Sequence, residues 1–538
     1  MYKVSLKESC FPAQKDTPFE PMTIGALLAR QAAATPDVIA LNELDYDGSI
    51  KRAWTYAALL EDATRLAKAL ANRHEKGTRI AVWAHNLPEW VLLEFASAMA
   101  GVTLVTVNPA YQARELEYVL KQSRSEAIYY VEEYRGNPMQ KIADEVCAII
   151  PEIKDRVLLT DHEDLFRGED VGVLPEVDPY DPAQIQYTSG TTGFPKGALL
   201  HHAGLVQNAL DASRRMGISA GARAVHHMPL FHTTGCAVLV LGQIGLGCTF
   251  FLAPVFDPEM IARVMAREKV TCVFGVPTMI VALIEQVQKH GLDVSSIQCI
   301  GTGGAMVAPE LVKEAERVLG AKISIVYGQT ETSPVITGVW PDDSIEDMTQ
   351  TIGQPAPHTE VSIRDTQTNK VVPIGEQGEI CCRGYQVMLE YNDNPEATAA
   401  TIDGEKWLHT GDLGRMDSRG FLKITGRVKE MIIRGGENLF PAEIENAMLE
   451  HSDIAECAVV GVADKKWGEQ VACFMRSGTG NQVDAVALKT FVRDRLSPQK
   501  TPAYWVWVDD WPLTGSGKIR KFLLAEQFEA GQFTPLSV

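Results

Sequence analysis

Residues 187–197 are the most informative stretch of this chain, and they read Tyr187-Thr188-Ser189-Gly190-Thr191-Thr192-Gly193-Phe194-Pro195-Lys196-Gly197. Ten of these eleven side chains are glycine, hydroxyl-bearing, proline or lysine, a composition that suits neither a core strand nor a packed helix. The glycines let the backbone approach a ligand closely, while the hydroxyls, backbone N–H groups and lysine are donors for anionic oxygens. The stretch predicts a phosphate-binding loop, with a flexible surface linker as the alternative.

The residues on either side of this loop indicate an α/β fold. Residues 183–187 alternate like a short strand, and after a short apolar run residues 205–210 are predicted to be helical. A glycine-rich loop between a strand and a helix is where open α/β folds bind nucleotides. It is not a Walker loop, because Pro195 stands at the second glycine position and Gly197 stands where serine or threonine must follow the lysine.

Composition limits the classes of partner. The 538 residues allow about two to four domains. The net charge of −19 argues against a nucleic-acid partner, which needs clustered positive charge. The ten cysteines form no CxxC pair, so no zinc or redox motif is predicted and a reducing cytoplasm fits best. The sequence is compatible with a homodimer but does not specify an oligomeric state.

One stretch imitates a membrane span. Residues 226–256 contain no Asp, Glu, Lys or Arg, and that length satisfies a hydropathy window. The stretch also contains four glycines, two prolines and three histidines. We therefore predict a loop, a buried helix and a buried strand that line an apolar substrate pocket, and no transmembrane segment.

Strand-like and helical segments alternate along most of the chain. Strands are expected at residues 78–83, 102–107, 127–131, 270–276, 297–300 and 323–327, and helices at 88–99, 112–122, 278–286 and 309–319. This order predicts an α/β fold of mostly parallel sheets flanked by helices. Beyond about residue 359, short strands and glycine-rich turns predict a small β-rich subdomain. Residues 429–538 have their own cycle of short elements, which predicts a small α+β C-terminal domain after a large N-terminal domain of residues 1–428.

Five further motifs follow the loop. They are Gly301-Thr302-Gly303-Gly304-Ala305, Tyr327-Gly328-Gln329-Thr330-Glu331-Thr332, Trp407-Leu408-His409-Thr410-Gly411-Asp412, the pair 426–430 and 435–438, and Leu513-Thr514-Gly515-Ser516-Gly517-Lys518. Glycines suit close approach of a flat ligand, an aromatic ring can stack on a base, and carboxylates can hold Mg²⁺ or ribose hydroxyls. Each motif alone is weak evidence, since a Thr-Gly-Asp run is more often a simple turn.

Taken together and in this order, the motifs resemble the adenylate-forming family of acyl- and aryl-CoA synthetases, peptide-synthetase adenylation domains and beetle luciferases. The resemblance covers about residues 24–525. It implies that ATP phosphates bind the loop residues Thr188, Ser189, Gly190, Thr191, Thr192 and Lys196. It implies that Gly303, Gly304 and Ala305 line the adenine and the acyl chain and that Tyr327 packs on the adenine ring, with Gly328 and Gln329 in the same cofactor site. It also implies that Asp412 binds the ribose with support from Arg427.

The resemblance also implies the reacting groups. Thr330 would contact the α-phosphate, Glu331 would bind Mg²⁺, and Lys518 would bridge the carboxylate and the α-phosphate. His232 would gate the acid pocket, Lys429 would be the hinge of a mobile C-terminal domain, and Gly436 would lie beside the CoA pantetheine. The implied reaction has two steps: a carboxylate attacks the α-phosphate of ATP to form an acyl adenylate and pyrophosphate, and a thiol then displaces AMP.

The absence of an acidic side chain in residues 229–235 narrows the branch of the family to which the chain could belong. Peptide-synthetase domains carry an aspartate there for an amino group, whereas this stretch has no acid. No carrier-protein segment follows residue 538, which favours CoA as the thiol, and the uncharged wall favours an apolar acid, medium-chain or aromatic. An acyl-AMP ligase that loads a carrier protein remains an alternative, as does a degenerate member that only binds nucleotide or acyl ligand.

Overall fold

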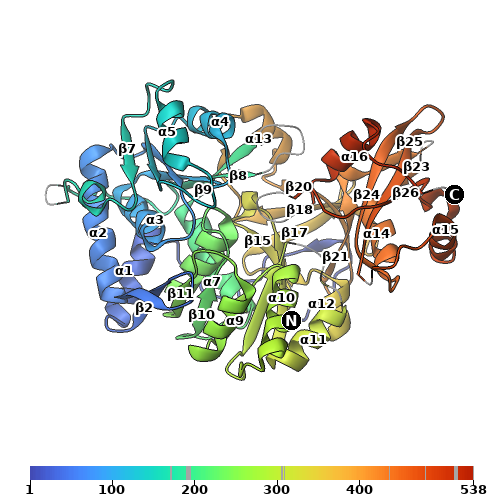
Figure 1. The fold of residues 1–538 in the computed structure, drawn as a ribbon, viewed down its shortest axis with the longest axis horizontal. Helices are drawn as coiled ribbons and strands as arrows, with labels where there is room; N and C mark the ends of the chain where they lie inside the picture. Colours follow the sequence, from blue (N-terminus) through green and yellow to red (C-terminus); the bar gives the residue numbers. More distant parts are fainter. Residues whose placement is uncertain are drawn as a thin grey trace.

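The computed structural model describes residues 1–169, 172–188, 195–304, 307, 309–434, 437–478, 480–513 and 519–536. They form a large body followed by a smaller lobe, which runs from strand β22 (Ile432–Arg434) to helix α16 (Lys521–Glu529) (Figure 1). The body contains three sheets and the lobe a fourth. The predicted α/β class, with a large N-terminal part and a small C-terminal part, is confirmed.

A seven-stranded sheet carries the predicted phosphate loop. Its strands, in spatial order, are β19 (Glu390–Tyr391), β9 (Lys196–His201), β8 (Pro182–Thr188), β5 (Thr103–Val107), β4 (Arg79–Trp83), β6 (Ala127–Tyr130) and β7 (Asp155–Leu158). Neighbours from β8 to β7 are parallel, whereas β9 is antiparallel to both β8 and β19. The strands expected at 78–83, 102–107, 127–131 and 183–187 are confirmed.

The expected passage from strand to helix at the phosphate loop is wrong. Residues 196–201 form β9, so the loop connects two antiparallel strands, and helix α7 (His202–Arg215) begins only after β9. The short apolar run Ala198–Leu200 is buried in the sheet, and a strand buried on both faces shows no alternation that would reveal it. The loop therefore does not lead directly into a helix N-terminus.

A nine-stranded sheet forms the second half of the body. Its strands, in spatial order, are β16 (Gln354–Pro355), β15 (Val335–Gly338), β14 (Lys322–Gly328), β13 (Cys299–Gly303), β12 (Cys272–Phe274), β10 (Arg223–His226), β11 (Thr249–Leu252), β2 (Ile39–Leu44) and β3 (Ile50–Thr55). The expected end of β13 at Ile300 is wrong, because the strand continues through Gly301 and Thr302 to Gly303. A Cβ at Gly301 would lie 2.5 Å from the Phe274 ring, so this glycine serves close packing inside the strand.

Helices cover these sheets. They are α1 (Ile24–Ala34), α2 (Tyr56–Arg73), α3 (Pro88–Ala100), α4 (Ala113–Ser123), α5 (Met139–Cys147), α6 (His162–Leu165), α9 (Pro258–Arg267), α10 (Pro277–His290), α11 (Pro309–Leu319), α12 (Ile345–Gln350) and α13 (Pro395–Thr401). Helix α3 illustrates why the sequence marks them well: proline occupies its first turn, and Gly101 ends it in the left-handed region at φ 66°.

The uncharged stretch 226–256 lies in the core of the body. After β10 it forms a π-helix, η1 (Thr234–Leu241), then the short helix α8 (Gly242–Gly245) and strand β11. Residues 235–244 are all buried, and η1 packs against α7. The expected loop, buried helix and buried strand are confirmed. Among the described residues, no helix combines the length and apolar character needed to cross a membrane.

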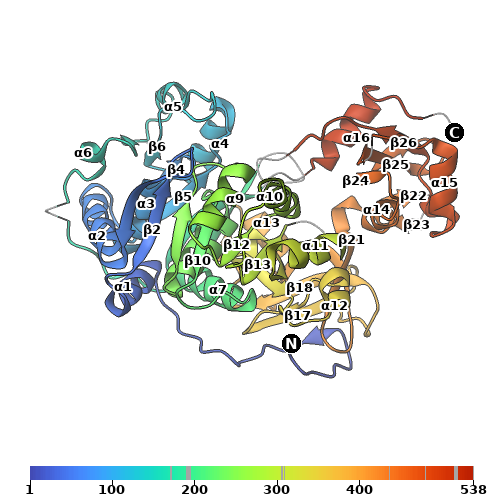
Figure 2. The same ribbon diagram turned by 60° about the horizontal axis from the view of Figure 1, so that its bottom comes forward.

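A five-stranded antiparallel sheet forms the expected β-rich subdomain. Its strands are β1 (Cys10–Phe11), β17 (Thr359–Arg364), β18 (Gly378–Gly384), β20 (Leu408–Met416) and β21 (Leu422–Arg427). The N-terminal segment runs along the body to supply β1 (Figure 2). The subdomain thus begins near residue 359, as expected, but its sheet also includes strand β1 from the N-terminal end of the chain.

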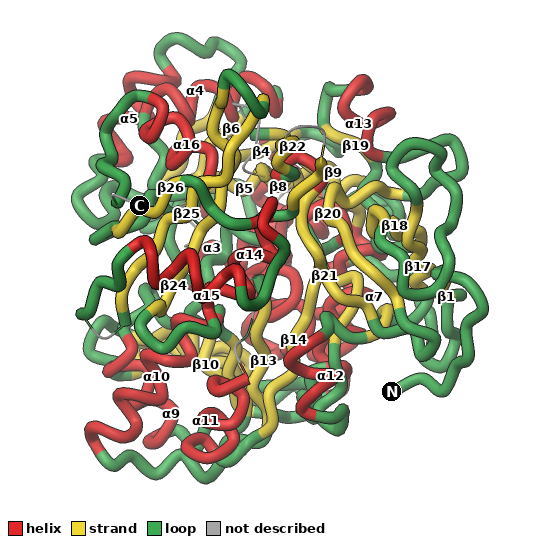
Figure 3. Tube along the Cα trace, turned by 90° about the vertical axis from the view of Figure 1, so that its right-hand side faces the viewer, coloured by secondary structure: helices red, strands yellow, loops and turns green. Residues whose placement is uncertain are grey.

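The small lobe has its own sheet and core. Its strands are β22, β23 (Glu437–Leu439), β24 (Ile454–Asp464), β25 (Gly468–Ser477) and β26 (Tyr504–Trp507). Helices α14 (Pro441–Leu449), α15 (Ala485–Arg493) and α16 surround these strands, as Figure 3 shows from the side of the lobe. Trp505 and Phe474 are fully buried on opposite sides of the sheet, in two separate hydrophobic clusters.

Candidate active site

Lys196, Tyr391 and Glu331 form a continuous line beside the phosphate-loop hairpin. Lys196 Nζ lies 4.9 Å from the centroid of the Tyr391 ring, and the Tyr391 hydroxyl donates to Glu331 Oε1 at 2.6 Å. Glu331 belongs to the 3-10 turn η2 (Thr330–Thr332), which follows β14, and its backbone carbonyl accepts from Met388 at 2.8 Å. Two sequence-predicted groups, the loop lysine and the Glu331 carboxylate, are therefore brought together by the edge strand β19.

The sequence analysis missed Tyr391. Burial and the neighbouring Glu331 carboxylate raise the pKa of the Tyr391 phenol, so the hydroxyl keeps its proton and remains a donor. No motif marks this residue; only the antiparallel pairing of β19 with β9 places it beside Lys196. The proximity of Tyr391 to Lys196 could not be predicted without knowing the order of strands in the sheet.

Both carboxylate oxygens of Asp412 accept hydrogen bonds from neighbouring side chains. The Tyr327 hydroxyl donates to Asp412 Oδ2 at 2.7 Å, and Arg427 Nε donates to Oδ1 at 2.8 Å. Asp412 and Arg427 are register partners in β20 and β21, whereas Tyr327 comes from β14 of the nine-stranded sheet. Burial and Asp412 raise the pKa of Tyr327, so this phenol also stays a donor. The three predicted residues meet at the junction of two sheets.

The glycines near these residues are required by packing. A Cβ on Gly303 would lie 2.5 Å from the Val326 carbonyl oxygen, and one on Gly328 would lie 1.8 Å from that of Pro334. Gly304 has a φ of +81°, in the left-handed region that favours glycine. Gln329 and Thr332 form a reciprocal cap around η2, which fixes the turn that carries Thr330 and Glu331. Thr330 and Glu331 are both buried.

His232 stands just before the π-helix. Its Nδ1 accepts from the Thr234 backbone N–H at 3.2 Å, and its carbonyl accepts from Gly235 N–H at 2.8 Å. A Cβ on Gly235 would lie 2.1 Å from the Pro229 carbonyl oxygen, so a glycine is needed for this tight turn. The turn holds the imidazole at the start of the buried apolar segment.

Several predicted residues lie outside the described residues. They are Ser189, Gly190, Thr191, Thr192, Ala305, Gly436 and Lys518, together with the side chain of Lys429. Their flanks are placed: Thr188 Oγ1 donates to the Lys196 carbonyl at 3.4 Å across the hairpin, and Leu513 pairs with Ile519 as an antiparallel bridge. Burial raises the pKa of Tyr111 in the body to about 12, and the positive charge of Arg520 opposes this rise.

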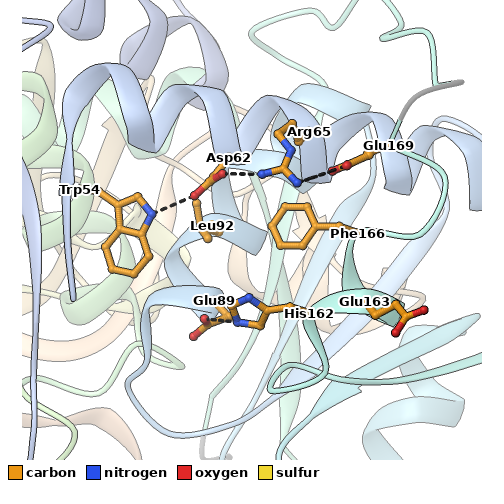
Figure 4. Close-up of a pocket in the computed structure, with 9 residues that line it drawn as sticks. All are labelled: Trp54, Asp62, Arg65, Glu89, Leu92, His162, Glu163, Phe166 and Glu169. Carbon is orange, nitrogen blue, oxygen red and sulfur yellow. Dashed lines mark hydrogen bonds and ion pairs between the residues drawn. The ribbon is translucent and has the colours of Figure 1, made fainter. Parts of the chain in front are cut away.

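A separate polar pocket of about 420 Å³ opens between α2, α3 and α6 (Figure 4). Two of its acidic side chains are engaged with their neighbours: Asp62 accepts from Trp54 and Arg65, and Glu89 Oε1 lies 2.9 Å from His162 Nε2. None of the sequence-predicted site residues lines it. The pocket is not the site that the motifs indicate.

The family models and the relatives with similar sequences agree on the family to which this chain is similar. Residues 28–392 match the family model described as AMP-binding enzyme, and residues 443–518 match the model for the AMP-binding enzyme C-terminal domain. The putative acyl-CoA synthetase YngI of Bacillus subtilis is 36% identical over 535 residues, which span 94% of this chain and 97% of that protein. The mitochondrial medium-chain acyl-CoA ligase ACSF2 of Macaca fascicularis is 34% identical, over 94% of this chain and 87% of that protein.

A solved structure shares the fold over almost the whole length. The crystal structure of ATP-bound MatB from Rhodopseudomonas palustris superposes with a TM-score of 0.84 at 27% identity, covering 94% of this chain and 99% of that chain.

Proposed function

The chain belongs to the AMP-binding enzyme family and is an AMP-forming acyl-CoA ligase, and from that premise we propose that its acid is apolar, either a medium-chain fatty acid or an aromatic acid. ATP and CoA are the co-substrates expected for the family. The uncharged segment from His226 through η1, most of which is buried, supports an apolar acid, because a pocket wall that it forms offers no charge to pair a second carboxylate or an amine. His232, which lies in that segment just before η1, is proposed to gate the acid pocket.

We also propose where ATP binds, and the observation that carries this assignment is that Glu331 and Asp412 are each held by a tyrosine hydroxyl, 2.6 Å from Tyr391 and 2.7 Å from Tyr327. Asp412, with its two oxygens oriented by Tyr327 and Arg427, is proposed to bind the ribose hydroxyls. Gly303, Gly304, Ala305, Tyr327, Gly328 and Gln329 are proposed to line the adenine. The loop Thr188 to Lys196 is proposed to hold the pyrophosphate end of ATP while Thr330 contacts the α-phosphate.

Glu331 fits the role of Mg²⁺ ligand. The Tyr391 hydroxyl donates to its Oε1 and so orients the carboxylate, whose hard oxygens are the kind of ligand that Mg²⁺ prefers. Mg²⁺, when bound there, would supply positive charge beside the ATP phosphates. The chain's own contribution is to orient that carboxylate through the Tyr391 hydroxyl and to place the Lys196 ammonium group over the same ring.

Transfer to CoA is proposed to use a rotation of the small lobe. We place the boundary between residues 1–428 and 429–538, with Lys429 as the hinge, Lys518 serving adenylation and Gly436 serving the pantetheine arm. Contacts near the boundary support a rigid small lobe, since Lys521 Nζ lies 3.0 Å from Glu430 and 2.8 Å from Glu445.

A pyrophosphate-release screen tests the proposed substrate class. Purified protein would be given MgATP with saturated acids of graded chain length, aryl acids, dicarboxylic acids and amino acids, each with and without CoA. We expect release to depend on an apolar acid and the thioester to form only with CoA. Preference for dicarboxylic or amino acids would overturn the apolar assignment. Thioester formation on a phosphopantetheinylated carrier but not on CoA would favour an acyl-AMP ligase, and no turnover on any acid would favour a member that only binds its ligands.

The location and assembly of the protein are also proposals. All ten cysteines are free thiols, which fits a reducing compartment, and we propose the cytoplasm. The relative ACSF2 is named as mitochondrial, so cell fractionation is the deciding measurement. Sedimentation analysis would test whether the chain forms a homodimer.

A further inference from the structure

Three metal-ligating side chains meet on one face of the five-stranded sheet. They are Glu379 and Cys381 of β18 and His409 of β20, and one ligand atom from each lies within 4.8 Å of the others. His409 Nδ1 is 2.8 Å from Glu379 Oε2 and 3.4 Å from Cys381 Sγ. In the part of the chain that the structure describes, no second cluster of this kind occurs.

The strand geometry explains why these three residues meet although they are far apart in sequence. Residues two apart on a strand point to the same face, so Glu379 and Cys381 share one side of β18. Cys381 is the register partner of His409 on the antiparallel neighbour β20. The next residue, Cys382, is directed to the opposite face, where it is buried in the hydrophobic core of the subdomain. The absence of a CxxC pair therefore gave no indication of this cluster.

We propose that Glu379, Cys381 and His409 form a binding site for a zinc-class divalent ion. Zinc takes thiolate, imidazole and carboxylate ligands in tetrahedral geometry, with bonds that place a sulfur and a nitrogen ligand about 3.5 Å apart. The observed 3.4 Å between Sγ and Nδ1 matches this spacing. The nitrogen–oxygen pair would have to open by roughly half an ångström to reach the same geometry. On metal binding the thiol proton of Cys381 leaves to solvent, because the thiolate is the ligand.

A fourth residue supports the histidine as a ligand. The other ring nitrogen of His409, Nε2, lies 3.6 Å from Asp403 Oδ2. A ligating histidine commonly directs its second nitrogen to a carboxylate, which sets the tautomer and the ring orientation. The Glu379 and His409 side chains are 14% and 21% exposed, so an ion can enter and a water can complete the tetrahedron.

The site is linked to the segment that carries Asp412. Glu379 Oε1 accepts from the Gly411 backbone N–H at 2.9 Å, and Asp412 is the next residue. A metal ion that draws the Glu379 carboxylate toward Cys381 would strain or release this bond. Zinc should therefore weaken ATP binding, a consequence that rests on the proposed ribose role of Asp412, whereas the metal site itself does not.

Titration with Co²⁺, followed by displacement with Zn²⁺, tests the site without ATP or turnover. Co²⁺ bound by a thiolate gives a charge-transfer absorption, so it reports directly on Cys381. We expect one ion per chain in the wild type and in the matched control Cys382→Ser. Cys381→Ser should abolish the absorption band and lower Zn²⁺ affinity at least tenfold, His409→Gln should also lower it at least tenfold, and Asp403→Asn should lower it about tenfold. Far-ultraviolet circular dichroism would verify that each variant is folded.

Equal Zn²⁺ affinity in wild type, Cys381→Ser and His409→Gln would overturn the proposal, as would a charge-transfer band that survives Cys381→Ser. The link to the nucleotide is measured separately, as the ATP dissociation constant with and without Zn²⁺. We expect it to rise severalfold in the wild type and in Cys382→Ser but not in Cys381→Ser. An unchanged ATP affinity at saturating Zn²⁺ would refute the link while leaving the metal site and the acyl-CoA ligase activity standing.

Discussion

The Tyr391 hydroxyl donates a 2.6 Å hydrogen bond to Glu331, and the same ring lies under the Lys196 ammonium group. These residues come from three separate elements, β19, η2 and β9. A single aromatic side chain thus orients the proposed metal-binding carboxylate and positions the lysine that ends the phosphate loop. This relationship leads to the first of five predictions.

Tyr391→Phe should lower kcat/KM for acid-dependent ATP–pyrophosphate exchange by about tenfold or more, because a hydrogen bond to a charged group contributes about 1.5–3 kcal/mol. The ring under Lys196 is retained, so the loss reports on the hydroxyl alone. We also expect half-maximal activity to require more Mg²⁺. Tyr46→Phe is the control, since Tyr46 is 62% exposed. Unaltered Mg²⁺ dependence and exchange in Tyr391→Phe would contradict the orienting role.

Asp412→Asn should raise the KM for ATP at least tenfold and leave the KM for the acid nearly unchanged. The amide cannot accept on both sides as the carboxylate does, and the Arg427 guanidinium loses its ion pair with residue 412. Initial-rate kinetics with each substrate varied in turn would separate the two constants. Parallel increases in both would show that the substitution perturbs the fold rather than the ribose site.

Lys518→Ala should suppress adenylation by two or more orders of magnitude while sparing thioester formation from supplied acyl adenylate. The reason is electrostatic: a positive charge is needed when the carboxylate approaches the α-phosphate, but not when a thiol attacks the adenylate. Measuring the two half-reactions separately provides the internal control. Equal losses in both would rule out a rotation of the small lobe between two catalytic arrangements.

Gly328→Ala should destabilise the protein by about 1–3 kcal/mol or more, because the added Cβ would lie 1.8 Å from the Pro334 carbonyl oxygen and the backbone must shift. Gly404→Ala is a matched control, since a Cβ there meets nothing within 4 Å. Denaturant unfolding would compare the two variants. A Gly328→Ala midpoint equal to that of Gly404→Ala would show that the turn relaxes without cost.

The buried His227 should make the protein less stable in acid. Burial lowers its pKa to about 4 from the ordinary value of 6.5, and neither ring nitrogen has a hydrogen-bond partner among the described residues. Between these two pH values the unfolded chain binds a proton that the folded chain does not, so the free energy of unfolding falls as pH decreases from about 6.5 to about 4. His227→Gln should reduce proton uptake on unfolding at pH 5 by roughly one proton. The same pH dependence in the variant and the wild type would exclude this contribution.

Helix α3 could be predicted because its ends carry local signals: Pro88 lies in its first turn and Gly101 ends it. Helix α2 was not among the expected helices, although Thr55 caps it by accepting from Ala58 N–H. Strand β9 could not be predicted, because burial on both faces removes the alternation that identifies a strand. The end of β13 was misplaced for a related reason: glycines that usually end a strand are used here for close packing within one.

The sequence alone identified the family and led to the proposed roles of the phosphate loop, Glu331, Asp412 and Lys518, because each of those motifs is contiguous in the chain. Only the tertiary structure decided which side chains orient them. Tyr391 reaches Glu331 through the pairing of β19 with β9, Tyr327 reaches Asp412 across two sheets, and His409 meets Glu379 and Cys381 through the register of β18 and β20. Such contacts depend on sheet order and strand register, which arise from packing over the whole domain and leave no local mark in the sequence.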